Sequence, residues 1–218
     1  GVTSNSELSS QYRVRGGNFD ENMVYLNDVE IYRPFLVRSG QQEGLSVVNP
    51  DMVNDIYFSA GGFDTKYNDK MSSVLDITYK KPTSFAASAS ASLLGATAHA
   101  EGSSKNQKFT AIVGTRYKTS KLLLGTFDTE GEYDPRFIDL QTYLTYAITP
   151  KWEVAALGYF GQTDYNFVPV DRTTTFGTLT NIQQLKIYFE GQEKDRFVSA
   201  LGTLSLTFKP TPQSRYKL

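Results

Sequence analysis

From Ser84 almost to its end, this chain alternates apolar and polar residues with a period of two, and this pattern restricts the possible folds most strongly. Period two is the repeat of a β-strand, because successive side chains of a strand point to opposite faces of the sheet. Between Ile138 and Ile148 one face would hold Ile138, Leu140, Thr142, Leu144, Tyr146 and Ile148, and the other Asp139, Gln141, Tyr143 and Thr145. The C-terminal part of the chain is therefore predicted to be an antiparallel sheet with one apolar face.

The alternation predicts about seven strands in an up-and-down meander. They are Ser84–Leu93, Thr97–Gly102, Lys108–Lys118, Ile138–Ile148, Trp152–Phe160, Leu185–Phe189 and Val198–Phe208. Short turns are expected at Ser103–Gln107, Thr149–Lys151 and Gln192–Asp195, and longer loops at Gly125–Arg136, Asp164–Gln183 and Pro210–Leu218. Strands of about ten residues that alternate between short and long connections are typical of outer-membrane barrels. Aromatic residues are expected near the strand ends, at Tyr146, Trp152, Phe160 and Phe208.

A soluble β-sandwich explains the same periodicity equally well. The second face of the strands is rich in hydroxyl groups and glycine, which favours the polar lumen of a barrel. The two folds differ in one arrangement. In a barrel the apolar faces form one continuous outward surface, with the N-terminal residues on the polar side, whereas in a sandwich the apolar faces of two sheets pack against each other.

Residues 1–82 have a mixed pattern that predicts a small α+β unit, and the character of the chain changes near Pro82. Strands are expected at Tyr12–Arg15, Met23–Ile31, Ile56–Ser59 and Ser73–Tyr79, and the segment Arg33–Gly44 is expected to be a loop. A short helix over Pro50–Asn54 is expected after Asn49, because Asn is a favoured helix cap and Pro is favoured at the first helical position. The sequence thus predicts two units, residues 1–82 and 83–218.

Composition excludes some classes of protein. The 22 Lys and Arg residues balance 23 Asp and Glu residues, so the charge gives no reason to propose a nucleic-acid partner. Cysteine is absent, which excludes disulfides and Cys-based zinc sites. No apolar run approaches the length of about 18 residues that a transmembrane helix needs. The chain opens without the basic and apolar regions of a signal peptide, so we expect a mature or truncated chain.

The sequence contains no constellation that indicates catalysis or a cofactor. His99 is the only histidine, and one histidine builds neither a metal cluster nor a triad. Four carboxylates stand at alternate positions in a predicted loop, at Asp128, Glu130, Glu132 and Asp134. Such oxygen ligands could hold Ca²⁺, but the glycine of an EF-hand turn is not in place, and solvated acidic loops are commoner. We therefore predict no enzyme, no cofactor and no metal site, and the calcium question stays open.

Two segments resemble the plug of TonB-dependent outer-membrane receptors. Val14–Tyr32 resembles the plug motif, with Asn27-Asp28 where the family usually has Asp-Gly. Val53–Tyr79 looks like the end of the plug, and its Asp-Lys-Met-Ser-Ser-Val-Leu-Asp-Ile stretch is similar to the Bacteroidetes branch. Asp139–Tyr146 and Tyr188–Gln192 are similar to early barrel strands of that branch.

The resemblance implies a receptor in the outer membrane of a Gram-negative cell that imports a ligand too large for porins. Its partners would be the TonB complex, the unknown ligand and outer-membrane lipid. Arg38, Gln41 and Gln42 would lie at the plug apex and contact the ligand. The alternative is a soluble β-rich ligand-binding or adhesion module.

The resemblance covers only part of such a receptor, because the barrels of outer-membrane transporters have about 22 strands. We therefore expect this piece alone to be incompetent for transport. An open sheet leaves unpaired strand edges and a bare apolar face. The fragment is expected to bury that face by curling, by collapsing around the N-terminal unit or by self-association through its open edges.

Overall fold

The structure is a computed structural model that describes residues 2–4, 12–17, 21–32, 46–67, 72–119, 121, 131–178 and 181–218. The protein is mainly β, and its sheets are antiparallel except for one strand pair. A short 3-10 helix, η2 (Pro50–Met52), lies among these strands. No helix within these ranges is long and apolar enough to cross a membrane.

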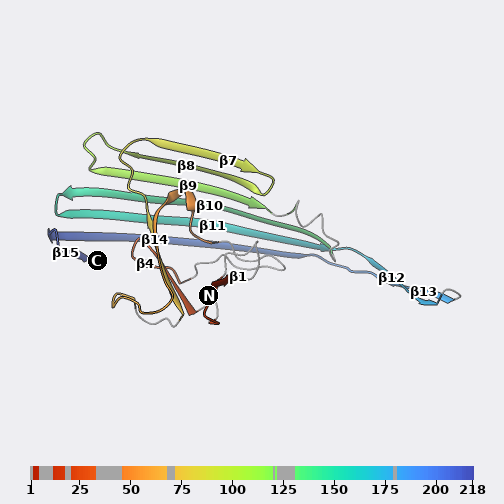
Figure 1. The fold of residues 1–218 in the computed structure, drawn as a ribbon. Coiled ribbons are helices and arrows are strands. Elements are labelled where there is room, and N and C mark those ends of the chain that lie inside the picture. Colours follow the sequence, from red (N-terminus) through yellow and green to blue (C-terminus); the bar gives the residue numbers. More distant parts are fainter. Residues whose placement is uncertain are drawn as a thin grey trace.

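Seven strands form one large antiparallel sheet, called here the wall sheet, in the order β15-β14-β11-β10-β9-β8-β7. Its strands are β7 (Ala86–Ser92), β8 (Gly95–Ser103), β9 (Phe109–Thr119), β10 (Gly131–Thr149), β11 (Trp152–Pro169), β14 (Glu193–Thr211) and β15 (Ser214–Lys217). Strands that follow one another in the chain also lie side by side in this sheet. Among the described strands the one interruption is between β11 and β14, where the chain forms a separate two-stranded hairpin before it returns to the sheet. The expected meander of an incomplete barrel is thus confirmed as a fold class, with the sheet lying open in Figure 1.

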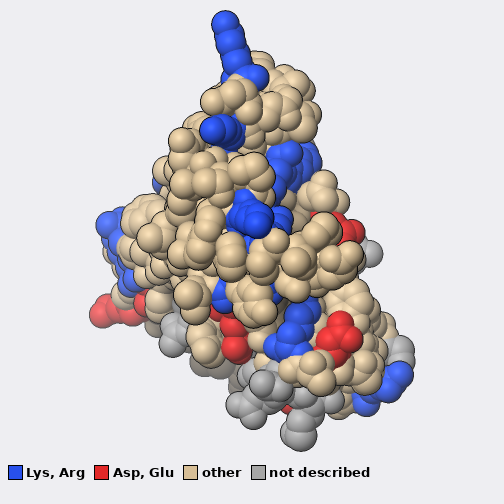
Figure 2. Space-filling model, turned by 90° about the vertical axis from the view of Figure 1, so that its left-hand side faces the viewer, with Lys and Arg blue, Asp and Glu red and all other residues tan. Residues whose placement is uncertain are grey.

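The hairpin of β12 (Arg172–Thr178) and β13 (Asn181–Ile187) projects beyond one end of the wall sheet (Figure 1). The turns Ser104–Lys108 and Pro150–Lys151 lie at the opposite end, called here the short-turn end. Figure 2 views the molecule from this end, and Lys and Arg dominate the upper part of that view. The two ends of the wall sheet therefore differ in shape, because only one of them carries a projecting hairpin.

The wall sheet is apolar on its outer face and polar on its inner face. Cross-strand partners share a face, and Leu140 pairs with Phe160, which pairs with Ala200. Leu140 and Phe160 are exposed, whereas the next residue on β10, Gln141, is buried. The exposed large apolar residues of the wall include Phe85, Leu93, Phe109, Val113, Ile138, Leu140, Tyr146, Ile148, Trp152, Phe160, Val198 and Leu204. Polar residues such as Asp139 and Gln141 thus face the interior, together with the apolar residues that form the core.

The N-terminal residues form a four-stranded sheet in the order β4-β3-β6-β5, which lies against the inner face of the wall (Figure 1). Its strands are β3 (Asn22–Leu26), β4 (Val29–Glu30), β5 (Val53–Ser59) and β6 (Ser73–Tyr79), and β3 and β6 are parallel. A separate pair joins β1 (Val2–Ser4) to β2 (Tyr12–Val14). We call the described residues before Thr83 the N-terminal unit.

The main core lies between the N-terminal unit and the wall sheet. Met52 and Tyr79 from the N-terminal unit pack in one cluster with Ile112, Tyr143 and Leu157 from the wall. These wall residues belong to the inner face, so the apolar outer faces of the wall strands do not pack against one another. The sandwich arrangement considered from the sequence is therefore not the one observed.

Several expected elements differ from the structure. Leu185–Phe189 is not a wall strand, because β13 pairs only with β12, and the seventh wall strand is β15, within the expected loop Pro210–Leu218. The expected turn Gln192–Asp195 already contains the start of β14. The expected loop Asp164–Gln183 is largely strand, because β11 stays paired with β10 up to Pro169. The outward-facing residues in this part of the strands are polar, as they would be in a loop, so the sequence does not reveal the strand. The backbone hydrogen bonds between β10 and β11 nevertheless continue.

The α+β character expected for the N-terminal residues is also reduced. The helix expected over Pro50–Asn54 is the three-residue η2, and β5 begins at once at Val53. Asn49 does cap it, accepting a hydrogen bond from the backbone of Asp51. The single strand expected over Met23–Ile31 is a hairpin, because Asn27 and Asp28 have φ of 52° and 66°, the backbone of a two-residue turn.

Candidate functional site

Arg116 and Asp139 form a buried ion pair on the inner face of the wall. They are cross-strand partners on β9 and β10. The Arg116 Nε atom lies 3.2 and 3.0 Å from the two carboxylate oxygens of Asp139, its Nη2 atom donates to Oδ2, and its backbone N–H donates to Oδ1 at 3.0 Å. The Arg116 side chain is 7% exposed and that of Asp139 is 0% exposed. Both charges are therefore removed from water and depend on each other.

The same guanidinium group holds a segment of the N-terminal unit by its backbone. Nη1 of Arg116 donates to the carbonyl oxygen of Val48 at 2.8 Å, and Nη2 donates to those of Ser46 and Val47, each at 3.1 Å. Three consecutive carbonyl groups thus converge on one side chain of the wall. This is the main polar contact between the segment that precedes η2 and the wall sheet.

Gln141 and Tyr79 extend this contact. Gln141 Nε2 donates to the carbonyl oxygen of Val47 at 2.7 Å and to Asp139 Oδ2 at 2.8 Å. The Tyr79 hydroxyl donates to Gln141 Oε1 at 2.5 Å and accepts from the backbone N–H of Asn49 at 3.2 Å. Burial raises the pKa of Tyr79 to about 12, against the hydrogen bond from Asn49, so the phenol keeps its proton at neutral pH. We call Arg116, Asp139, Gln141 and Tyr79 the polar cluster.

Gly114 provides the space for this close approach. A Cβ atom at Gly114 would lie 2.5 Å from Asn49 Nδ2 and 2.9 Å from Met52 Sδ. Both residues are fully buried. A larger residue on β9 would therefore push η2 away from the wall and stretch the hydrogen bonds of the polar cluster.

We expect the substitution Tyr79→Phe to destabilise the contact by about 1–3 kcal/mol, because Gln141 Oε1 and the Asn49 N–H both lose their partner in a buried place. Denaturant unfolding of the full-length protein in detergent measures the change. Tyr57→Phe is the matched control, since Tyr57 is exposed on β5. Equal stability of the two variants would show that the hydroxyl contributes nothing.

Charged side chains also join the N-terminal unit to the wall, and one such pair is Lys81 Nζ with Glu153 Oε1 at 2.5 Å. Lys80 Nζ lies 3.9 Å from Glu101 Oε2, which lies 3.4 Å from His99 Nε2, and His99 Nδ1 lies 2.6 Å from the hydroxyl of Ser88. At the edge of the wall, Asp28 contacts Lys217 and Arg215, each at 2.9 Å. Burial raises the pKa of the Asp28 carboxyl, but the hydrogen bond and charge of Lys217 outweigh it, so the pKa lies below its usual value.

The residues expected to form sites fall mostly outside this contact. Arg38, Gln41, Gln42, Asp128 and Glu130 lie outside the described residues, and the side chain of Glu132 is not described. Asp134 contacts Arg136 at 2.7 Å and Lys121 at 3.6 Å. Within the described ranges no three metal-ligating side chains come together. The arrangement therefore holds two sheets together.

Sequence reasoning missed the polar cluster, although a signal was present. The alternation places Asp139 and Gln141 on the polar face of one predicted strand, and Arg116 lies in the neighbouring strand. A charged pair of opposite sign on the polar faces of adjacent strands indicates a cross-strand ion pair. The sequence did not reveal that Arg116 also binds the backbone carbonyl groups of residues 46–48. Every residue type has such a carbonyl group, so no particular residue in the sequence indicates this contact.

Comparison with known proteins gives one informative similarity. No family model and no curated protein sequence matches the chain. Among solved structures, it is similar to the crystal structure of the ferripyoverdine receptor of the outer membrane of Pseudomonas aeruginosa bound to ferripyoverdine, with a TM-score of 0.50 and 12% identity. The similarity covers 91% of this chain but only 26% of that receptor. At this identity it shows the fold alone: the chain has a TonB-dependent-receptor-like fold.

Proposed function

We propose that this chain is part of an outer-membrane receptor for TonB-dependent uptake of a ligand too large for porins. Residues 1–82 would be the end of its plug and residues 83–218 the first strands of its barrel. The observation that carries this proposal is the polarity of the wall sheet, which exposes apolar residues outward and seats the N-terminal unit on its polar inner face. A soluble module would leave so large an apolar face in water, which soluble proteins avoid.

The height of the apolar band supports a membrane location. On β10 the outward-facing residues run from Ile138 to Ile148 without a charge. Ten steps of about 3.4 Å give about 34 Å along the strand, or about 26 Å for a strand tilted by about 40°. Outer-membrane barrels have an apolar band of about 25 Å. The strand therefore has the length needed to cross that layer.

Aromatic residues mark the border of this band at the short-turn end. The rings of Trp152 and Phe208 stack with centroids 4.3 Å apart, and Tyr216 lies 6.4 Å from Phe208. These are the outermost rings of three adjacent strands, β11, β14 and β15. Aromatic girdles lie at both interfaces of membrane barrels, and the turns at the periplasmic interface are short. The short-turn end would therefore be the periplasmic one.

The ligand contacts and the branch of the family are proposed from the sequence resemblance and not from the polarity of the wall sheet. The solved neighbour carries ferripyoverdine, and we assign no ligand to this chain. Arg38, Gln41 and Gln42 remain our proposed contacts at the plug apex, and the TonB complex the proposed energy partner. The Bacteroidetes branch is proposed from the sequence resemblance of residues 69–77, 139–146 and 188–192, since the solved neighbour comes from Pseudomonas.

Cysteine labelling in intact cells tests the proposal. The chain has no cysteine, so Thr175→Cys on the projecting hairpin and Lys151→Cys in a short turn each give it one thiol. In a full-length protein without other cysteines, a membrane-impermeant maleimide should label residue 175 in intact cells, and residue 151 only after the outer membrane is opened. Absence of the protein from the outer-membrane fraction, or labelling of both sites in intact cells, contradicts the proposal.

A further inference from the structure

A band of charged residues crosses the outer face of the wall just beyond the apolar band. Arg136 pairs with Asp164, which pairs with Arg196, and one step further Asp134, Asn166 and Lys194 form a second cross-strand row. Directly below them lies the row of Ile138, Gln162 and Val198, so these residues share the outward face. We call the two rows the charged rim. It lies at the end of the wall opposite the short turns.

The depth of the charged rim matches a lipid headgroup layer. Its rows stand two and four residues beyond Ile138 on β10, which is about 7 and 14 Å along the strand. At a tilt of about 40° these become roughly 5 and 10 Å above the hydrocarbon. Headgroups add about 5–7 Å on each side of the hydrocarbon layer. The first row therefore lies within the headgroup layer, and the second row lies a few ångström beyond it, from where a long side chain such as that of Lys194 can reach back to the headgroups.

The charge of the rim is positive and not fully neutralised. The two rows carry three positive charges, of Arg136, Lys194 and Arg196, against the two negative charges of Asp134 and Asp164, a net charge of +1. Beside the rows, Lys121 adds one positive charge next to Asp134, and Asp195 adds one negative charge. Asp164 takes a single contact from Arg196, at 2.5 Å through Nε, which leaves the two terminal nitrogens of Arg196 as donors. Among the described residues the Lys194 ammonium makes no ion pair. Strong donors thus remain for an outside anion.

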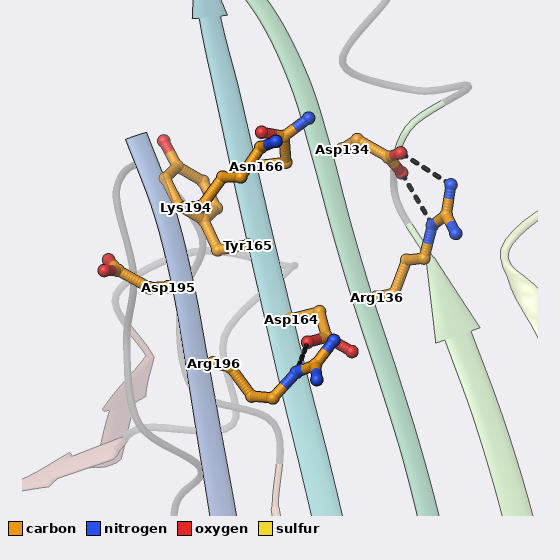
Figure 3. Close-up of a pocket in the computed structure, with 8 residues that line it drawn as sticks. All are labelled: Asp134, Arg136, Asp164, Tyr165, Asn166, Lys194, Asp195 and Arg196. Atoms are coloured by element: carbon orange, nitrogen blue, oxygen red, sulfur yellow. Dashed lines mark hydrogen bonds and ion pairs between the residues drawn. The ribbon is translucent and has the colours of Figure 1, made fainter. Parts of the chain in front are cut away.

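The rim is also hollowed. A cavity of about 450 Å³ is lined by both rows and by Tyr165 and Asp195. Figure 3 shows Arg136 turned toward Asp134 on one side of the cavity and Arg196 meeting Asp164 across β11. The side chains of Arg136 and Arg196 are 56% and 69% exposed, so their donors are accessible. A headgroup phosphate has a volume well below that of this hollow.

We propose that the charged rim binds the phosphate groups of an anionic lipid in the outer leaflet of the membrane. The proposal rests on the membrane location argued above, and it adds a site on the outside of the wall. Arginine and lysine donors form charge-assisted hydrogen bonds with phosphate oxygens, and arginine does so with two parallel bonds. Asp134 and Asp164 keep the guanidinium groups in place and limit how much anion the rim accepts.

Native mass spectrometry of the full-length protein in a zwitterionic detergent tests this site, with diphosphoryl lipid A as the probe. The double variant Lys194→Gln/Arg196→Gln should weaken lipid binding about tenfold. Arg196→Lys with Lys194 kept should retain most of it, because the charge remains. Lys105→Gln/Lys108→Gln removes two exposed cations at the short-turn end and serves as the matched control, with binding unchanged.

Three results would overturn the proposal: unchanged binding in the rim variant, an equal loss in the short-turn variant, or displacement of the lipid by equimolar inorganic pyrophosphate, which would indicate a site for free phosphate. Failure of the membrane location is a separate result. It appears as the absence of wild-type protein from the outer-membrane fraction. A rim variant that reaches the outer membrane normally and still binds lipid A like wild type contradicts only the lipid site.

Discussion

The substitution Arg116→Met is expected to destabilise the contact between the N-terminal unit and the wall by about 3–5 kcal/mol, because it leaves the Asp139 carboxylate buried without its counter-charge. It also removes the donor to the carbonyl groups of Ser46, Val47 and Val48. Hydrogen exchange of the full-length protein in detergent measures the effect, and exchange should rise in residues 46–52 well before it rises in the wall strands.

Two further variants identify the cause of this loss. In Arg116→Met/Asp139→Leu no charge remains buried, so a large part of the lost stability should return. Arg116→Lys keeps the charge, but it cannot reproduce the fork that reaches Asp139 and three carbonyl groups, and it should remain clearly destabilised. If Arg116→Met alone exchanges like the wild type, the ion pair does not hold the two units together.

The substitution Gly114→Leu is expected to have an effect of similar size, about 3 kcal/mol or more. The new side chain would have to occupy space held by Asn49 and Met52, both fully buried. Because these residues form η2 and its cap, the expected result is displacement of η2 from the wall. Limited proteolysis should then cut near residues 49–53 in the variant and not in the wild type.

Gly202→Leu is the matched control for this experiment. Gly202 also lies within a wall strand, and a Cβ atom there would meet nothing within 4 Å. It pairs with Gly158, on the outward face, where an added leucine would extend the exposed apolar surface. Equal proteolysis of the two variants would mean that the damage comes from loss of a strand glycine and not from crowding of η2.

Much of the wall sheet was predictable from the sequence because its outer face holds apolar residues and its inner face many polar ones, so alternate positions are under opposite demands. Between Ile138 and Ile148 each position is under one of these demands, and the assigned faces agree with the structure. Beyond the apolar band both faces meet polar surroundings, so the alternation fades although pairing continues. For this reason the sequence failed to show that β11 reaches Pro169.

The pairing of strands was harder to predict than their existence. Leu185 and Ile187 alternate as in a wall strand, yet both lie in the projecting hairpin, since local periodicity does not say which neighbour a strand has. The four residues of β15 are too few to give a period. Only part of the polar cluster could be predicted from the sequence. The pairing of Arg116 with Asp139 follows from their side chains, whereas the contact with the carbonyl groups of residues 46–48 does not depend on residue type.

The hydrogen bonds from Arg116 to three successive carbonyl groups determine which amino-acid substitutions this contact tolerates. Every residue offers the same carbonyl, so exchanging Ser46, Val47 or Val48 leaves the acceptors of Arg116 in place. The wall residues have no such freedom, because Arg116, Asp139 and Gln141 each act through their own side chain. Substitutions at residues 46–48 therefore leave these hydrogen bonds in place, whereas substitutions at Arg116, Asp139 or Gln141 remove them.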